Sequence, residues 1–374
     1  MGQGLFSRSS KCLLILFFIF VCSGYLFPES SEKNSELSAE KILQQNMTNY
    51  GNLVAIIKPK TSDILIKNQT HMMIKKDNNS YLYFCRYRGD FAVSRYNLNW
   101  KHLKTYNFSV KNYSAQTPFN VSIGHDSIYV MIYNLSSVNV NLDNGVLAVI
   151  NTDLKSHKMY TINSAGIVDG RFDDQVYLYS YNFKYKGLPW GSVMQGGIFY
   201  DYKINNIIKK IDYNYNGYDI LNAMSITWEC DNPGDRYSIM RTKDGAMVMT
   251  LMNHENGQVN IIANLSSQID SKMHTTIGWD NSEHVLKDGR NITYGYEARS
   301  GNYLFCDVTI DPCNSVKWEQ YFLIYNISTG KIKIIKNPLP DKPRPFSLNP
   351  FDYIDGYLFV NCSWFVYKIK VGLI

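Results

Sequence analysis

Short tyrosine-rich apolar runs recur along this chain, each preceded by turn-forming residues. The six copies start roughly 46 to 65 residues apart and occupy residues 81–85, 127–131, 175–179, 237–240, 302–306 and 357–360. Tyrosine and β-branched residues favour pleated, half-buried strands. Most copies are followed by an apolar strand, a polar turn and a lysine-bearing alternating strand, as in residues 321–335. The pattern predicts four strands per repeat and almost no helix after residue 51.

Repeats of this length with four strands each are the sequence signature of β-propeller blades. A single four-stranded sheet buries neither face, whereas sheets packed around an axis bury both. Over residues 52–374 the chain therefore resembles the β-propeller superfamily in general, with WD40- and kelch-like architecture. The repeated signatures of those two families are missing, because Trp279-Asp280 and Gly196-Gly197 each occur once. We expect about six blades, with five or seven as alternatives. A two-sheet sandwich is the alternative fold; it explains the short strands but not the repeat.

The two ends of this region look like parts of one blade. Residues 357–371 provide two strands with no hairpin after them, and residues 53–67 provide a hairpin with no strands before it. Sharing one sheet would close the ring and leave no unpaired edge between its ends. We therefore predict an all-β propeller of four-stranded blades, closed by N- and C-terminal strands in a common blade.

The N-terminal residues predict entry into the secretory pathway. Two basic residues precede an apolar run over 12–22, and two small residues follow it. This arrangement is typical of a signal peptide. Apolar residues resume at 25–27, and the resulting run is short for a membrane-spanning helix, which needs about twenty residues. Residues 1–23 are thus a cleaved signal peptide or an uncleaved signal-anchor, 24–51 a polar linker or stalk, and 52–374 the propeller.

Glycosylation sequons and cysteines point to the same compartment. Eleven Asn-x-Ser/Thr sequons occur, at Asn46, Asn68, Asn78, Asn107, Asn112, Asn120, Asn134, Asn264, Asn291, Asn326 and Asn361. Cys306 and Cys313 flank a short Asp-Pro turn, so we predict a disulfide between them, with two buried thiols as the alternative. The chain has no C-x-x-C pair, which argues against a zinc site.

Acidic residues stand at the entrances to several tyrosine-rich strands, where propeller loops surround the central channel. They include Asp126, Asp173, Asp174, Asp235 and Asp355. Converging carboxylates would bind a sugar, hold a cation such as calcium, or act as acid and base, and Asp173, Asp174 and Asp235 are the catalytic candidates. Alternatively, each carboxylate caps its own turn. We predict no other cofactor.

Tryptophans in predicted loops form a second candidate site. Trp190, Trp228 and Trp279 lie near polar residues, a setting that suits stacking on sugars or anchoring a protein partner. The alternative is that each indole packs beneath its own loop. Together with the acidic entrances, these residues are the predicted ligand-binding groups.

Charge and motifs narrow the function further. The net charge is +6, from 38 basic and 32 acidic residues, without a dense basic stripe, so we do not expect a nucleic-acid partner. Nucleophile-elbow, zinc-protease and phosphate-loop motifs are absent. We favour a secreted or membrane-tethered recognition module for a protein or glycan, acting on the non-cytosolic side and touching the membrane only through its N-terminal segment. A propeller hydrolase of glycosidase or lactonase type and a structural surface glycoprotein are the alternatives.

Overall fold

Strands account for all the regular structure that the computed structural model describes. The described residues are 53–57, 71–77, 79–87, 90–111, 119–133, 145–163, 166–172, 174–182, 193–215, 220–242, 246–268, 275–277, 284–286, 291–311, 319–338, 348–362 and 365–374. None of them belongs to a helix long and apolar enough to cross a membrane. The apolar run over 12–22 and the predicted stalk lie outside these residues. Cleavage of the N-terminal segment therefore stays a prediction.

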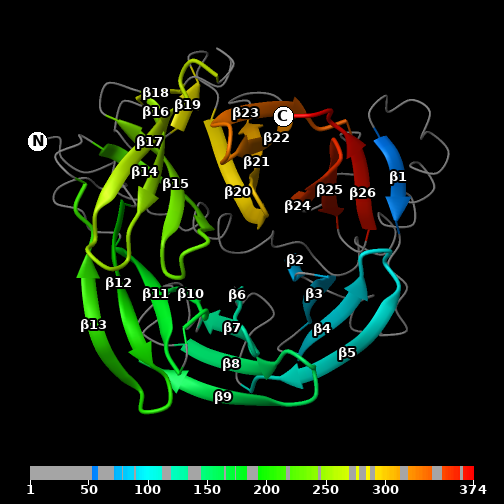
Figure 1. The fold of residues 1–374 in the computed structure, drawn as a ribbon, viewed down its shortest axis with the longest axis vertical. Coiled ribbons are helices and arrows are strands. Elements are labelled where there is room, and N and C mark those ends of the chain that lie inside the picture. The colour runs from blue at the N-terminus through cyan, green and yellow to red at the C-terminus, as the bar shows by residue number, and fades with distance from the viewer. Residues whose placement is uncertain are drawn as a thin grey trace, which may run out of the picture.

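Six antiparallel sheets stand around a central axis and make a six-bladed propeller (Figure 1). Blade 1 contains β2 (His71–Asp77), β3 (Ser80–Tyr87), β4 (Asp90–Asn97) and β5 (His102–Ser109). Blade 2 contains β6 (Phe119–Ile123), β7 (Ser127–Tyr133), β8 (Gly145–Asn151) and β9 (His157–Ile162). Blade 3 contains β10 (Ile167–Asp169), β11 (Val176–Asn182), β12 (Val193–Asp201) and β13 (Asn206–Asp212).

The second half of the ring repeats this order. Blade 4 contains β14 (Ile220–Glu229), β15 (Arg236–Thr242), β16 (Met247–Met252) and β17 (Val259–Asn264). Blade 5 contains β20 (Asn291–Ser300), β21 (Tyr303–Asp311), β22 (Glu319–Asn326) and β23 (Lys331–Lys336), and its sheet is extended beyond β20 by β19 (His284–Leu286) and β18 (Thr275–Ile277). Blade 6 contains β24 (Leu348–Ile354), β25 (Tyr357–Cys362), β26 (Phe365–Lys370) and β1 (Leu53–Ile57).

Blade 6 closes the ring as predicted, with strands from both ends of the described chain. β1 pairs with β26 in antiparallel register, from Leu53 opposite Ile369 to Ile57 opposite Val366. The division of strands differs from our expectation. The C-terminal side supplies three strands, because β24 precedes the two predicted ones, and the N-terminal side supplies β1. The second strand of the predicted N-terminal hairpin lies outside the described residues.

The core consists of six hydrophobic clusters, and each joins two consecutive blades. Representative members are Leu82 and Val130 for blades 1 and 2, Met131 and Leu178 for blades 2 and 3, Tyr177 and Met240 for blades 3 and 4, Trp228 and Leu304 for blades 4 and 5, Phe322 and Leu358 for blades 5 and 6, and Tyr81 and Phe351 for blades 6 and 1. Each blade therefore buries both faces against its neighbours, as the repeat predicts.

The tyrosine-rich runs are the second strands of the blades. In β3, Tyr81 and Tyr83 belong to the cluster with blade 6, whereas Leu82 and Phe84 belong to the cluster with blade 2. Successive side chains of a strand point to opposite faces, so a strand packed between two blades is apolar at every position. Large rings with a polar tip fill these wide gaps, and the hydroxyl of Tyr81 still finds a hydrogen-bond partner in Asp352.

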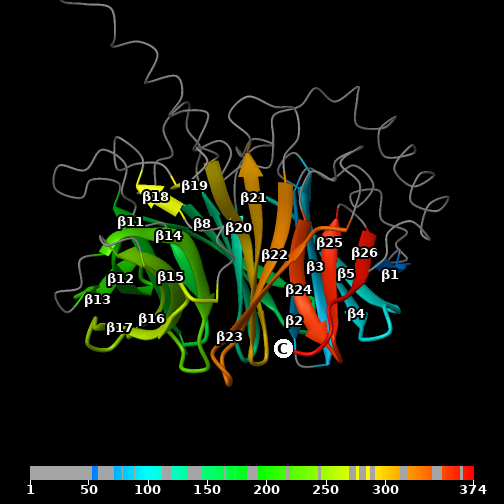
Figure 2. The same ribbon diagram turned by 90° about the horizontal axis from the view of Figure 1, so that it is seen from above.

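One face of the ring carries the connection between the first and second strand of every blade. The described residues of these connections, at 79, 124–126, 170–172, 174–175, 230–235, 301–302 and 355–356, define what we call the turn face. Contacts between neighbouring blades bring them together: the Gly170 backbone N–H donates to Ser122, and that of Gly234 donates to Asp169. The turns between third and fourth strands share this face, because neighbouring strands run antiparallel (Figure 2).

Candidate binding pocket on the turn face

Two exposed acidic candidates lie on the turn face, and each contacts a basic residue nearby. Asp126 accepts a hydrogen bond from the adjacent His125 ring at 2.9 Å, with its side chain 88% exposed. Asp174 has a positive φ of 41° and pairs with Lys203 of the same blade. Asp173 lies outside the described residues.

Two further candidates shape their own turns. Asp235 is buried and accepts hydrogen bonds from the Asn232 side chain and the His254 backbone N–H, both at 2.8 Å. Burial alone would raise the pKa of Asp235, but the His254 and Asn232 hydrogen bonds keep it below its ordinary value. Asp355 is exposed in the β24–β25 turn at φ 51°. Among the described residues, no group of three or more His, Cys, Asp or Glu is placed to hold a metal ion.

An ion pair narrows the axial channel at this face. Lys75 on β2 reaches Glu229 on β14, with 3.2 Å between nitrogen and oxygen. Blades 1 and 4 stand opposite each other in a ring of six, so this pair bridges the axis. Burial alone would raise the pKa of Glu229, but Lys75 and Arg236 lower it below its ordinary value. At this point on the axis the Glu229 carboxylate is therefore paired with a lysine rather than free.

Trp228 is a core residue, which corrects its assignment to a ligand-binding surface. Its side chain on β14 is 1% exposed, and its indole N–H donates to the Phe305 backbone oxygen at 2.8 Å. The indole packs between blades 4 and 5 and has no face open to a ligand. Trp190 and Trp279 lie outside the described residues, and their roles stay predictions.

The sequon asparagines differ sharply in exposure. Asn107 on β5 and Asn264 on β17 are exposed near strand ends opposite the turn face. The half-buried Asn120 amide bonds to the backbone of blade 3. Asn326 and Asn361 are 5% and 0% exposed, so a glycan there would require the side chain to leave the interior. Asn46, Asn68, Asn78, Asn112 and Asn134 lie outside the described residues, and only the backbone of Asn291 is described.

The described cysteines on blades 4 and 5 are buried. Cys306 lies in the cluster between these blades, and Cys313 lies outside the described residues, so their disulfide stays a prediction. Burial, together with the nearby Asp235 charge, raises the pKa of the Cys230 thiol to about 12. This thiol therefore stays protonated at neutral pH and is a poor nucleophile.

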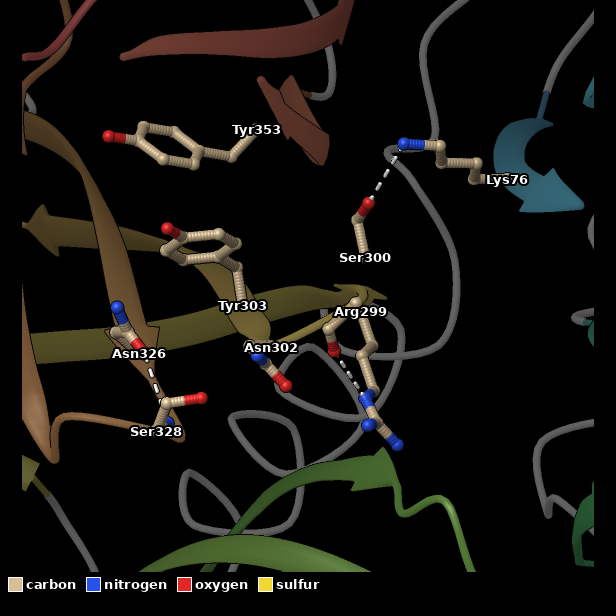
Figure 3. Close-up of a pocket in the computed structure, with 9 residues that line it drawn as sticks. Lys76, Arg299, Ser300, Asn302, Tyr303, Asn326, Ser328 and Tyr353 are labelled. Atoms are coloured by element: carbon tan, nitrogen blue, oxygen red, sulfur yellow. Dashed lines mark hydrogen bonds between the residues drawn. The ribbon is translucent and has the colours of Figure 1, made fainter. Parts of the chain in front are cut away.

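A pocket of about 600 Å³ opens on the turn face between blades 5 and 6 (Figure 3). Residues 299–303, which span the β20–β21 turn, form one wall, and Asn326 with Ser328 forms a second. Tyr353 at the end of β24 and Lys76 at the end of β2 complete the lining. This volume is within the range of small-molecule sites.

A buried carboxylate anchors the inner end of the pocket. Asp352 is 0% exposed and accepts hydrogen bonds from Lys76 Nζ at 3.0 Å, Tyr81 Oη at 2.7 Å, Ser300 Oγ and the Tyr353 backbone N–H. Three of these donors, Lys76, Ser300 and the Tyr353 N–H, bond to Oδ1, and Tyr81 bonds to Oδ2. Asp352 therefore joins blades 1, 5 and 6, and it fixes the positions of Lys76 and Ser300.

Arg299 is also held in place, at the side of the pocket toward blade 4. Its guanidinium donates to the backbone oxygens of Glu229 at 2.8 Å and Gly301 at 2.9 Å, and to Asp231 Oδ1 at 2.5 Å. The Arg299 side chain is 14% exposed, whereas Asp231 is 90% exposed. The arginine thus ties blade 5 to blade 4 and carries its own counter-ion.

Two tyrosines form the aromatic wall. The rings of Tyr303 and Tyr353 lie 4.5 Å apart between centroids at 55°, with their hydroxyls pointing the same way (Figure 3). The Tyr353 hydroxyl donates to the Gly372 backbone oxygen at 2.6 Å. Burial, with Tyr303 nearby, raises the pKa of Tyr353. The fixed Tyr353 ring supports Tyr303, which is half-buried and faces the pocket.

Several neutral polar groups on the rim are not engaged within the described residues. They are the Asn302 amide, the Ser328 hydroxyl and the Tyr303 hydroxyl, for which we find no hydrogen bond from the side chain to any described group. Sequence reasoning missed them because Gly301-Asn302 before a tyrosine-rich strand looks like any other hairpin turn. The available signal was an asparagine directly before a tyrosine in a predicted turn.

Comparison with known proteins adds only distant similarities. No family model and no curated protein matches the chain. Among solved structures, it is similar to a predicted exported protein of Bacteroides fragilis NCTC 9343 (11% identity, TM-score 0.46, covering 85% of this chain and 95% of that one). It is also similar to the Neurospora crassa Pan2 WD40 domain (6%, 0.41, 86% and 96%) and to the SapL1 lectin in complex with alpha methyl fucoside (9%, 0.37, 78% and 87%). At these TM-scores, the propeller assignment rests on the six sheets of this chain itself.

Proposed function

We propose that this chain is a recognition module on the non-cytosolic side of a membrane, secreted or tethered, and that it binds a protein or glycan ligand in the turn-face pocket. One observation carries the proposal. The pocket combines an open volume of about 600 Å³ with a supported aromatic ring and neutral hydrogen-bonding groups that are not engaged within the described residues. Ligand sites combine apolar surface with a few positioned polar groups in this way.

The engagement of the acidic residues supports binding over hydrolysis. A glycosidase uses two carboxyl groups that flank the scissile bond from a shared cleft. Here Asp235 accepts hydrogen bonds from its own turn and from His254, and the fully buried Asp352 accepts hydrogen bonds from four donors. These two buried carboxylates are therefore engaged in holding the fold rather than placed to flank a scissile bond.

The compartment follows from the N-terminal apolar run and the sequons. Asn107 and Asn264 are exposed near the face opposite the pocket. Glycans at these two positions would leave the turn face accessible. This geometry fits a protein whose turn face meets its ligand outside the cytosol.

A binding screen tests the proposal. The purified secreted chain is screened against glycan and peptide libraries, with and without calcium, and each hit is repeated with Tyr303→Ala. We expect the variant to lose about tenfold in affinity, because removing the ring costs about 1.4 kcal/mol of binding. Tyr160→Ala is the matched control, since Tyr160 is also half-buried and packs on a second tyrosine, Tyr202, at 4.8 Å.

Repeating each hit with Trp190→Ala as well separates three hypotheses: binding in the pocket, binding at Trp190, and a structural glycoprotein without a ligand. Hits that Tyr303→Ala weakens and Tyr160→Ala leaves unchanged support the pocket. Hits lost only in Trp190→Ala would move the site to that tryptophan. The absence of any hit from a folded protein would favour the structural surface glycoprotein.

A further inference from the structure

We infer that the turn-face pocket takes an uncharged, polyhydroxylated ligand, a neutral sugar residue, rather than an anionic glycan or an acidic peptide. This inference rests on the proposed function and names its ligand class. It follows from two observations: the charged groups of the pocket already have counter-ions, and several neutral polar groups on its rim have no hydrogen-bond partner among the described residues.

Both cations of the pocket carry their own counter-ions. Lys76 Nζ lies 3.0 Å from Asp352 Oδ1, and this carboxylate is fully buried. Arg299 lies 2.5 Å from Asp231 and uses further N–H groups on two backbone oxygens. An anionic ligand would have to displace these partners before it gained an ion pair, and displacing Asp352 would leave a buried carboxylate unpaired. The pocket therefore lacks the unpaired cation that recognition of an anion requires.

The polar groups left over are neutral and suit hydroxyl groups. An amide offers two donors and an acceptor, and a serine or tyrosine hydroxyl both donates and accepts. These groups come from two adjacent turns of blade 5, one with Asn302 and Tyr303 and the other with Ser328. A backbone hydrogen bond joins the two turns, from the Ile327 N–H to the Asn302 backbone oxygen at 2.8 Å. Sugar hydroxyls also donate and accept, so each rim group has a complementary partner on such a ligand.

The aromatic wall completes the match. The Tyr303 ring packs on the ring of Tyr353, and the Tyr353 hydroxyl is hydrogen-bonded to the Gly372 backbone oxygen. The Tyr303 ring is therefore positioned before a ligand arrives. A fixed amphipathic ring gives contact area at low conformational cost. The C–H face of a sugar packs on such a ring while its hydroxyls reach Asn302 and Ser328.

The test is a glycan array with three arms, probed with the full secreted chain. The arms are neutral oligosaccharides, sialylated or sulfated oligosaccharides, and acidic peptides. We expect binding in the neutral arm, with an affinity that changes less than about twofold when salt is raised from about 0.05 M to 0.5 M, because no ion pair is screened. Asn302→Ala and Tyr303→Ala each weaken this binding about tenfold.

Control variants keep the test decisive. Tyr303→Phe retains the ring, so it should lose less affinity than Tyr303→Ala while melting at the same temperature. Asn256→Ala removes an exposed asparagine from the β16–β17 turn on the same face and should leave affinity unchanged. Pocket-dependent binding confined to the charged arms, or strongly weakened by salt, would overturn the inference and leave the proposed function standing. Binding in no arm would overturn the inference and leave a protein ligand for the proposed function. Binding that ignores both pocket variants would overturn both.

Discussion

Buried carboxylates on the turn face act as junctions between blades. Asp169 is 0% exposed at the end of β10 and accepts hydrogen bonds from Arg171 and from the Gly234 backbone N–H in blade 4. Gly234 has a φ of 82°, and a Cβ at this position would meet the His254 ring at 2.6 Å. Only glycine allows the turn to bring its N–H to Asp169. The carboxylate therefore links the geometry of one turn to the packing of two blades.

This junction makes stability depend on pH. Burial alone would raise the pKa of Asp169, but Arg171, Arg236 and the Gly234 N–H lower it to about 2. Because the folded pKa lies below the unfolded value of about 3.9, the stabilisation is present above that value and disappears as pH falls toward 2. We expect the difference in unfolding free energy between wild type and Asp169→Asn to shrink by about 2 kcal/mol from pH 6 to pH 2.

Urea unfolding at fixed pH values measures this difference. Asp126→Asn is the control, because its carboxylate is 88% exposed and contacts only the neighbouring His125 among the described residues. A pH-independent gap between wild type and Asp169→Asn would contradict an ionised, stabilising Asp169.

At the scale of elements, the closing blade is the distinctive one. Five blades are single stretches of chain, and β1 alone among the described strands joins its sheet from the other end of the sequence. Its pairing with β26 covers an edge that would otherwise expose backbone groups. The ends of an open ring separate easily, so this short strand contributes to the stability of the whole molecule.

Replacing residues 53–57 with glycine and serine should therefore destabilise the propeller. We expect the melting temperature to fall by several degrees, since each kcal/mol corresponds to about 2–4 °C in large domains. Hydrogen exchange should accelerate in β26, which loses its partner. The same replacement over residues 40–44 of the predicted stalk is the control. Unchanged exchange in β26 would show that the ring holds without β1.

The whole molecule has two different faces. The turn face carries the pocket, the junctions at Asp169 and Asp352, and short turns, whereas the exposed sequon residues Asn107 and Asn264 lie near the opposite face. The proposed ligand pocket and these two exposed sequons therefore lie at opposite ends of the blades. The division rests on strand direction alone, because a residue near the end of a fourth strand is always far from the turn face.

Removal of N-glycans should thus leave ligand binding intact. We expect treatment of the native protein with an N-glycosidase to lower its mass and to change the affinity for its ligand by less than about twofold. Mass spectrometry and a binding titration on the same sample provide the two readouts. A large loss of affinity with an unchanged melting temperature would place a glycan at the pocket. An unchanged mass would remove the glycosylation proposal.

The sequence by itself determined the blades and their closure, because burial of both faces makes the second strand of a blade apolar at every position, as Tyr81 to Phe84 show. Local residues also marked the turns. Among the described acidic residues, Asp126, Asp174, Asp235 and Asp355 lie in connections between strands. The sequence does not show their partners, since Asp174 meets Lys203 and Asp235 meets His254 only after folding.

Only the tertiary structure decided where the candidate pocket lies. Lys76, Tyr303 and Tyr353 are far apart along the chain and come together because blades 1, 5 and 6 converge on Asp352. Likewise, Trp228 became a core residue because blade 5 covers it. Short-range patterns follow from strand geometry, whereas a pocket between blades depends on which turns the ring brings side by side.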